Sequence, residues 1–317
     1  MRCWVGWWRR CCSWLPASPP DGGRPTRIAG PMSDKALLDT LADEVRPGSG
    51  SPELVPLDPD HPGFRDPVYR ARRNAIAKLA FDYVPGDPAP TATYTDEEHG
   101  VWKHVRELLD PRHRDFACSE YLECVDAVAL DRIRIPQLED VNARIRPLTG
   151  FRMLPVAGLV TARAFLSFLA DRIFLATQYI RHASRPLYTP EPDVIHELVG
   201  HAASFAHPLY CGLSAHFGRA ARVASDEDVE RIARLYWFTL EFGAAIEDGK
   251  PKAYGAGLLS SVGEMDRLGD AGLRRFDCRT MADTAYDPTD FQPFYFVAPS
   301  FGAMHDQVTE FLRDFCD

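Results

Sequence analysis

The stretch Tyr188-Thr-Pro-Glu-Pro-Asp-Val-Ile-His196-Glu-Leu-Val-Gly-His201 decides how this chain is interpreted. Its two prolines predict a helix that begins just before the histidines, within residues 192–205, because proline favours the first helical turn. The histidines stand five residues apart, whereas the metalloprotease pattern places them four apart. On an ideal α-helix five positions separate two side chains by about 140°. The pair is therefore expected to converge only if His196 lies in an irregular first turn.

Glu241 is the third candidate ligand. It lies on a helix predicted over residues 226–248, which Ser225 caps and Gly249 ends, and it follows Ala233 and Trp237 at steps of four on an apolar stripe. Burying an unpaired carboxylate is costly, and a cation is its simplest partner. Two neutral imidazoles and one carboxylate form the facial triad of Fe(II) oxygenases.

Other interpretations of these residues stay open at this point. Histidines in helices are commonly packed or solvated, and a glutamate on an apolar stripe can pair with an arginine. A zinc hydrolase could use His196, Glu197 and His201, although the five-residue spacing argues against it. A catalytically silent binder of an amino acid or a pterin is a further alternative.

The rest of the chain indicates a mostly α fold. We expect a single helical catalytic domain over residues 61–317, with a few short β-strands such as Ala253–Tyr254 and Phe294–Val297. Residues 1–60 are expected to form a disordered extension, in which Met32 is a more natural start. The helical patterns cover residues 66–83, 95–109, 115–127, 136–144, 161–182, 192–205, 208–221 and 226–248.

Composition narrows the function classes. The formal net charge is −9, from 45 acidic and 36 basic side chains, and no basic cluster is present, which disfavours nucleic-acid binding. No uninterrupted apolar run is long enough to span a membrane. The eight cysteines form no CxxC pair, which suggests a reducing cytoplasm.

Several ordered blocks of sequence resemble the catalytic domain of the pterin-dependent aromatic amino acid hydroxylases, and most closely the members that act on phenylalanine in bacteria. The resemblance covers about residues 61–315, so it is far more specific than the histidine pair alone. The blocks are residues 61–73, 135–141, 150–158, 177–182, 188–201, 236–243, 252–261 and 294–297.

The resemblance implies roles for individual residues. His196, His201 and Glu241 would bind Fe(II), and Arg181, held by Asp193, would bind the substrate carboxylate through a bidentate fork. The other implied substrate residues are Thr189, Pro192, Trp237, Gly257 and Ser260. The implied tetrahydropterin residues are Leu159, Val160, Ala162, Phe165, Glu197 and Ala233, with Phe165 stacking on the pterin and Glu197 acting through water.

The implied reaction is hydroxylation of free L-phenylalanine with O2 and a tetrahydropterin, giving tyrosine. Trp237 and Val297 favour phenylalanine over tryptophan or tyrosine. Leu175 and the pair Ala202-Ala203 depart from the family pattern near the site, so 3-hydroxylation to meta-tyrosine stays an alternative. We expect a cytoplasmic monomer that depends on pterin-recycling enzymes.

Overall fold

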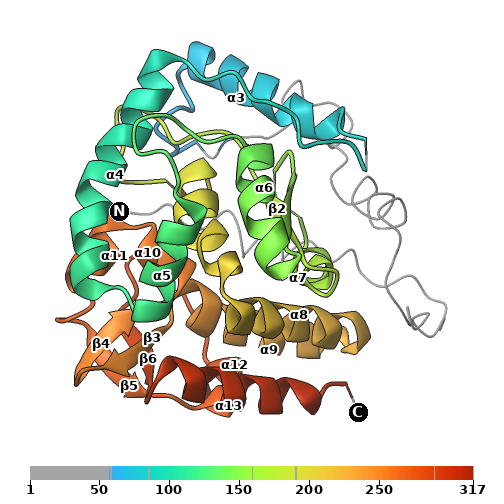
Figure 1. Cartoon of the computed structure of the whole chain (residues 1–317), viewed down its shortest axis with the longest axis vertical. Helices are drawn as coiled ribbons and strands as arrows, with labels where there is room; N and C mark the ends of the chain where they lie inside the picture. The colour runs from blue at the N-terminus through green and yellow to red at the C-terminus, as the bar shows by residue number, and fades with distance from the viewer. Residues whose placement is uncertain are drawn as a thin grey trace.

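The computed structural model describes residues 57, 59–84, 86–158, 160–189, 191–288 and 290–316 (Figure 1). The extension expected at residues 1–60 lies outside this part of the chain except for residues 57, 59 and 60. Leu159, predicted to contact a pterin, also lies outside it. Among the helices described, none has both the length and the apolar character that crossing a membrane requires.

Helices dominate the described chain, which confirms the expected mostly α fold with a few short strands. The first part contains α3 (Pro67–Phe81), α4 (Asp96–Phe116), α5 (Ser119–Val128), α6 (Leu138–Thr149), β1 (Arg152–Pro155), α7 (Ala162–Leu169) and β2 (Ile173–Ala176). The central part contains the π-helix η1 (His196–Ala202), the 3-10 helix η2 (Ser204–Ala206), α8 (Pro208–Val223), α9 (Asp226–Tyr236) and the π-helix η3 (Trp237–Glu241). The last part contains β3 (Ala244–Glu247), β4 (Lys250–Ala253), α10 (Ala256–Leu259), α11 (Val262–Arg267), β5 (Gly272–Arg275), α12 (Cys278–Asp283), β6 (Phe294–Ala298) and α13 (Phe301–Arg313).

The single helix predicted over residues 161–182 is wrong. Helix α7 ends at Leu169, and β2 then pairs in parallel with β1. Arg172 separates the two elements with a left-handed backbone, φ 58°, which no helix interior adopts. A short, fully buried apolar strand cannot be distinguished from a buried helix by its pattern alone, and this ambiguity caused the error.

The helix predicted over residues 226–248 is also too long. The N-cap at Ser225 is confirmed, since its side chain accepts the Asp228 N–H. The helical segment ends at Glu241, however, and β3 follows. Gly249 does not end a helix: with Asp248 it forms the turn between β3 and β4, and both residues have positive φ (51° and 74°). An Asp-Gly pair is a strong hairpin signal, so the sequence did contain the correct answer.

Packing around α8 places the functional elements. Helix α8 packs against α7, α9 and α13, and α8, α9 and α13 lie side by side at the base of Figure 1. The order of the four-stranded sheet is β4-β3-β6-β5, with β3 and β4 antiparallel and the other pairs parallel. Helix α10 packs on both η1 and η3, and η3 leads into β3. The two π-helices are therefore brought together in the molecule's interior.

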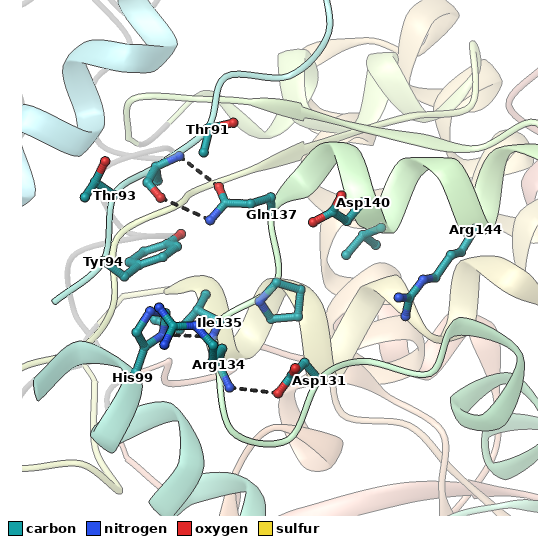
Figure 2. Close-up of a pocket in the computed structure, with 13 residues that line it drawn as sticks. Thr91, Thr93, Tyr94, His99, Asp131, Arg134, Ile135, Gln137, Asp140 and Arg144 are labelled. Carbon is teal, nitrogen blue, oxygen red and sulfur yellow. Dashed lines mark hydrogen bonds between the residues drawn. The ribbon is translucent and has the colours of Figure 1, made fainter. Parts of the chain in front are cut away.

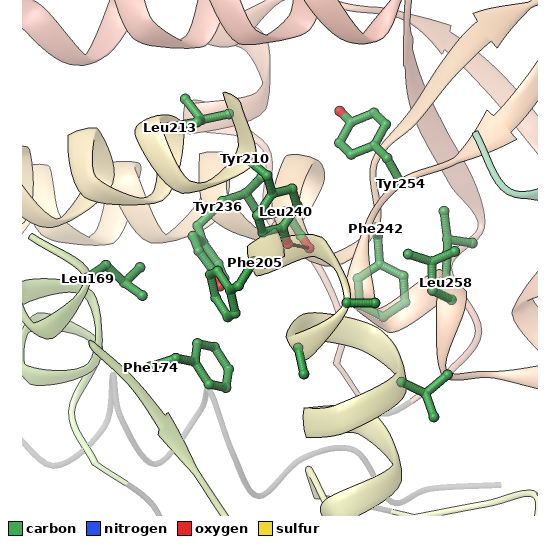
Figure 3. Close-up of a cluster of buried hydrophobic side chains, with 14 of the residues drawn as sticks. Leu169, Phe174, Phe205, Tyr210, Leu213, Tyr236, Leu240, Phe242, Tyr254 and Leu258 are labelled. Atoms are coloured by element: carbon green, nitrogen blue, oxygen red, sulfur yellow. Dashed lines mark hydrogen bonds between the residues drawn. The ribbon is translucent and has the colours of Figure 1, made fainter. Parts of the chain in front are cut away.

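Aromatic side chains surround the place where these elements meet (Figure 3). The Phe174 ring lies 4.4 Å from the ring of His201, and the Phe205 ring stacks on His201 at 6.1 Å. Phe174 and Phe205 also contact each other, and both are almost fully buried. This packing leaves His201 in an apolar environment from which bulk water is excluded.

Candidate active site

Both candidate histidines lie in the π-helix η1. A π-helix closes its hydrogen bonds between residues five apart rather than four. Side chains at positions i and i+5 therefore share a face, so the spacing that an α-helix would spread apart brings His196 and His201 together. His196 does lie in the first turn of the helical segment, and the irregularity that brings the pair together extends through Ala202.

Glu241 is the last residue of the second π-helix, η3. The Phe242 N–H donates to the Trp237 carbonyl, five residues earlier, at 2.8 Å. Helix α9 thus widens over its final turn, just where Glu241 faces the histidines. π-Helical turns are rare and are frequent at functional sites. Two of them together supply the three candidate ligands.

Hydroxyl groups satisfy carbonyls within both π-helices. Tyr121 donates to the Val199 carbonyl in η1 at 2.8 Å. Tyr210 donates to the Leu240 carbonyl, next to Glu241, at 3.2 Å (Figure 3). A buried carbonyl left without a donor costs about 1–3 kcal/mol, so these bonds stabilise backbone geometry that is otherwise unfavourable.

The three ligand candidates form one compact group. The Nε2 atoms of His196 and His201 lie 3.1 Å apart, and Glu241 carboxylate oxygens lie 3.0 Å from His201 Nε2 and 3.5 Å from His196 Nε2. Their exposed fractions are 7%, 0% and 3%, respectively. Within the part of the chain that the structure describes, no other group of three His, Cys, Asp or Glu side chains could hold a metal ion.

The spacing and charge of this group fit a metal ion. Two ligand atoms at right angles, each about 2.1 Å from one ion, lie about 3 Å apart. Burial lowers the pKa of His196 to about 4 and that of His201 to about 3, so both imidazoles are neutral and can donate a lone pair. Burial raises the pKa of Glu241 to about 7, and its Oε1 receives no hydrogen bond. A bound cation would stabilise this carboxylate.

Ser260 orients the first histidine. Its hydroxyl donates to the Ala256 carbonyl at 2.7 Å and lies 3.0 Å from His196 Nδ1. Since the hydroxyl proton is used on Ala256, Ser260 accepts the proton of Nδ1. This bond assigns the tautomer of His196 and leaves its Nε2 lone pair facing the other ligands.

A cleft of about 600 Å³ opens onto His196. Five of the seven predicted substrate residues line it, namely Arg181, Thr189, Pro192, Gly257 and Ser260. The structure therefore brings most of the predicted substrate residues to the same cavity as the triad.

Asp193 lies behind this lining and holds Arg181. One Asp193 oxygen accepts Arg181 Nε and backbone N–H at 2.8 Å each, and the other accepts Nη2 at 2.8 Å. Burial alone would raise the pKa of Asp193, but the charge and hydrogen bonds of Arg181 lower it overall. The carboxylate is therefore ionised and the guanidinium is fixed in orientation.

Trp237 is not among the lining residues. Its ring lies one layer deeper, 4.6 Å from the ring of Phe242, which does line the cleft. Tyr286 stacks on its other face at 4.2 Å. Trp237 therefore shapes the substrate wall indirectly, through neighbours that line the cleft such as Phe242.

The predicted pterin residues form a set separate from this lining. Phe165 packs edge-on against Phe174 and Tyr236 and is 4% exposed. Val160 and Ala233 are buried and Ala162 is partly buried. Glu197 Oε1 accepts both the N–H and the hydroxyl of Thr177 at 3.0 Å, and burial raises the Glu197 pKa to about 8. None of these residues lines the cleft on His196, and their role stays a prediction.

Several lining residues were missed by sequence reasoning. Phe242, Glu264 and Gln292 face the cleft from three separate elements, and Leu187 and Phe291 stand at its mouth. Phe242 directly follows Glu241, so the sequence offered a hint. The others come from loops or from α11, and no local pattern distinguishes them from ordinary surface or core residues.

A second pocket, of about 470 Å³, lies away from the triad (Figure 2). The Gln137 side chain bridges the backbone N–H and carbonyl of Ala92, at 2.8 and 3.0 Å, and thereby closes one side. The pocket contains none of the predicted site residues. It belongs to the scaffold between α4 and α6.

The fold and the site define a helical metalloprotein with a two-histidine, one-carboxylate centre. Comparison with known proteins specifies the family. Residues 50–316 match the model of the biopterin-dependent aromatic amino acid hydroxylases, and the chain belongs to that family.

Curated relatives act on more than one amino acid. The chain is 46% identical to human tyrosine 3-monooxygenase over 263 residues, covering 80% of this chain and 49% of that protein. It is 45% identical to rat phenylalanine-4-hydroxylase over 261 residues, covering 80% and 58%, respectively. The chain thus spans about half the length of the curated relatives it matches. Identities this similar do not select a substrate.

Solved structures with the same fold include bacterial phenylalanine hydroxylases. The apo enzyme of Colwellia psychrerythraea superposes with a TM-score of 0.68 at 28% identity, covering 74% of this chain and 92% of that one. The Chromobacterium violaceum enzyme, in a structure with bound iron(III) and 7,8-dihydrobiopterin, gives 0.67 at 30% identity, covering 71% and 84%.

Proposed function

We propose that the protein is an iron- and tetrahydropterin-dependent monooxygenase that hydroxylates the ring of free L-phenylalanine to give tyrosine. The observation that carries this proposal is one cavity with two features. His196 lines its floor, in contact with the buried His201 and Glu241 behind it, and the fixed guanidinium of Arg181 lies in its wall. Family membership and the bacterial phenylalanine hydroxylase structures support the same conclusion.

The triad would hold Fe(II) through three neighbouring positions and leave the others open. When bound, Fe(II) and the tetrahydropterin together activate molecular oxygen, which protein side chains cannot do. The chain's own contribution is to orient and to exclude water. Ser260 sets the His196 tautomer, and Phe174 with Phe205 keeps water from His201.

Arg181 is suited to the carboxylate of a free amino acid. A guanidinium offers five N–H donors. Three of them are used, by Asp193 through Nε and Nη2 and by the Pro186 carbonyl through Nη1 at 3.4 Å, which leaves two for a ligand. Thr189, Pro192 and Gly257 would then border the rest of the substrate.

For the pterin we retain the residues that the family resemblance implies: Leu159, Val160, Ala162, Phe165, Glu197 and Ala233. Glu197 supports this assignment in one respect. Thr177 occupies only one of its two carboxyl oxygens, so the other is left for a water molecule or a ligand. The proposed stacking on Phe165 requires the pterin to enter beside an already packed ring.

Phenylalanine is favoured over tryptophan by Trp237, and over both tryptophan and tyrosine by the bacterial structural neighbours. Val297 loses its weight as an argument, because it lies in β6 opposite Ala244 and does not line the cleft. Leu175 and Ala202-Ala203 are buried near the triad, so 3-hydroxylation to meta-tyrosine is the second candidate reaction. A zinc hydrolase is disfavoured by family membership rather than by histidine spacing, since the π-helix does bring the pair together.

Three further expectations stay predictions: a cytoplasmic location, a monomeric state and dependence on pterin-recycling enzymes. Among the described residues, Cys118, Cys124, Cys211 and Cys278 are buried free thiols. That pattern is compatible with a reducing compartment.

One incubation tests the proposal. Purified protein is mixed with Fe(II), a tetrahydropterin, O2 and L-phenylalanine, and products are separated against para- and meta-tyrosine standards. Para-tyrosine supports the proposal as stated, and meta-tyrosine replaces only the ring position. No product from phenylalanine, with turnover of tyrosine or tryptophan instead, contradicts the proposed substrate.

A further inference from the structure

The indole N–H of Trp237 has a specific partner deep in the molecule. Trp237 is 1% exposed, and its Nε1–H donates to the side-chain carbonyl of Gln292 at 3.0 Å. A buried indole N–H normally requires such an acceptor. Gln292 comes from the segment just before β6, 55 positions away in the chain.

The orientation of the Gln292 amide is fixed. Its Nε2 donates to the carbonyls of Asp287 and Asp290, at 3.2 and 3.4 Å, so its oxygen must face Trp237. Its backbone N–H donates to Glu264 Oε1 at 3.0 Å. Gln292 is itself 2% exposed and borders the cleft.

Glu264 anchors this arrangement from α11. It is 5% exposed, and its second carboxyl oxygen accepts the hydroxyl of Tyr295 in β6. Burial raises the pKa of Glu264 to about 7. The hydrogen bonds from Gln292 and Tyr295 offset part of the cost of burying this group.

The arrangement leads to the substrate wall and to the metal centre. Trp237 begins the π-helix that ends at Glu241, and its ring lies against Phe242. Phe242 in turn is confined from the cleft side, since a methyl group on Gly257 would meet its ring at 2.5 Å. A rotation of the Trp237 indole therefore displaces the Phe242 ring into or away from the cleft.

We propose that Gln292 is a positioning residue for the aromatic wall of the substrate site, acting through the Trp237 indole N–H and held in place by Glu264. The inference rests on the proposed function. Gln292 fixes the rotation of Trp237, Trp237 fixes Phe242, and Phe242 sets where the substrate ring lies relative to the triad. Nothing in this role requires Gln292 to touch the reacting atoms.

The test uses the iron-loaded full chain and the variant Gln292→Met, which keeps the length of the side chain and removes its hydrogen bonds. We expect KM for phenylalanine to rise about tenfold, equivalent to roughly 1.4 kcal/mol, with a changed ratio of para- to meta-tyrosine. Iron content and KM for the pterin should be unchanged. The matched control is Gln137→Met, which removes an equally bridging amide in the distant pocket (Figure 2) and should leave KM and product ratio unchanged.

A double-mutant cycle separates positioning from plain destabilisation. Trp237→Phe removes the donor, so adding Gln292→Met to it should change KM and product ratio no further. Additive effects, or a lower Tm with unchanged KM and product ratio in Gln292→Met, would overturn the inference.

A readout without substrate keeps this test distinct from the proposed function. The indole N–H resonance of Trp237, assigned by its loss in Trp237→Phe, should exchange slowly with solvent in the wild type and quickly in Gln292→Met. If phenylalanine is not a substrate but this resonance behaves as expected, the proposed function fails and the hydrogen bond to Gln292 stands. If phenylalanine is hydroxylated and the resonance is unchanged in Gln292→Met, the inference fails alone.

Discussion

The floor of the cleft and its mouth are built in different ways. The floor consists of His196, which lines the cleft, and of His201 and Glu241 directly behind it, all at most 7% exposed and all carried by π-helices. The mouth consists of Leu187 and Phe291, which are 45% and 47% exposed and are carried by loops. Side chains at the floor are therefore held from several directions, whereas those at the mouth are held from one.

The two regions meet different requirements: the floor must hold a metal ion, and the mouth must admit the substrate. At the floor, hydroxyl groups from distant helices satisfy backbone carbonyls, Ser260 orients His196, and aromatic rings pack against His201. Such geometry is favourable for a metal ion, whose ligands must be held closely in place. At the mouth, exposed apolar side chains can move as an aromatic amino acid enters. Substitutions should therefore matter most at the floor and least at the mouth.

The largest effect is expected from Glu241→Gln. The amide keeps the shape of the side chain but removes the charge that a cation needs, so we expect bound iron to fall below one tenth of stoichiometric and activity to fall more than about 100-fold, beyond the effect typical of residues that merely support a ligand. Iron analysis of the purified protein and turnover assays measure this. The control Glu107→Gln changes an exposed carboxylate and should retain both. Full iron occupancy in Glu241→Gln would show that the carboxylate is not a ligand.

The next effect in size is expected from Arg181→Lys. Arg181 lines the cleft between its floor and its mouth. Lysine keeps the charge but cannot reproduce the fork that binds Asp193, so KM for the amino acid should rise about 10- to 100-fold. Iron content should stay at the wild-type level, because the Arg181 side chain is bound by Asp193 and is not one of the three candidate metal ligands. An unchanged KM would remove Arg181 from the substrate site.

A smaller effect is expected from Tyr210→Phe at the edge of the floor. This change leaves the Leu240 carbonyl without a donor and should lower the free energy of unfolding by about 1–3 kcal/mol. Iron affinity should weaken as well, since Glu241 adjoins that carbonyl. The control Tyr83→Phe removes a hydrogen bond from the exposed Asp87 carbonyl and should cost much less. Equal stability losses in the two variants would mean that the π-helix gains nothing from Tyr210.

The sequence predicted the chemistry of the floor better than its geometry. The three candidate ligands were suggested by two imidazoles and a carboxylate on an apolar stripe, and the family resemblance implied the same set; the structure brings them together. Neither π-helix was predicted, because helix propensity and hydrophobic periodicity are defined for α-helices and strands. They contain no separate signal for a π-helical turn. The strand Ile173–Ala176 was not predicted for a related reason: four buried apolar residues fit a helix as well as a strand.

The mouth and the hydrogen bonds behind the wall were beyond sequence reasoning. Gln292 and Glu264 are 28 positions apart, and their contact depends on how α11 packs near β6. The family resemblance identified Trp237 but placed it at the wall, whereas the structure puts Phe242 there instead. Long-range packing of this kind has no local pattern.

The smallest effect is expected from Phe291→Ala at the mouth. The ring is half exposed, and its guanidinium neighbour, Arg267, lies 5.0 Å away. Stability should change by no more than about 0.5 kcal/mol, as is usual for surface positions. KM for phenylalanine should rise only two- to threefold, by the loss of roughly 0.5 kcal/mol of apolar contact. A loss of activity as large as that of Glu241→Gln would contradict the distinction between floor and mouth.

The most direct test of the metal centre is anomalous diffraction at the iron edge from crystals of the iron-loaded protein. Our account predicts one strong peak, about 2 Å from Nε2 of His196, from Nε2 of His201 and from a carboxylate oxygen of Glu241. A peak elsewhere, or none at all in crystals that contain stoichiometric iron, would contradict it.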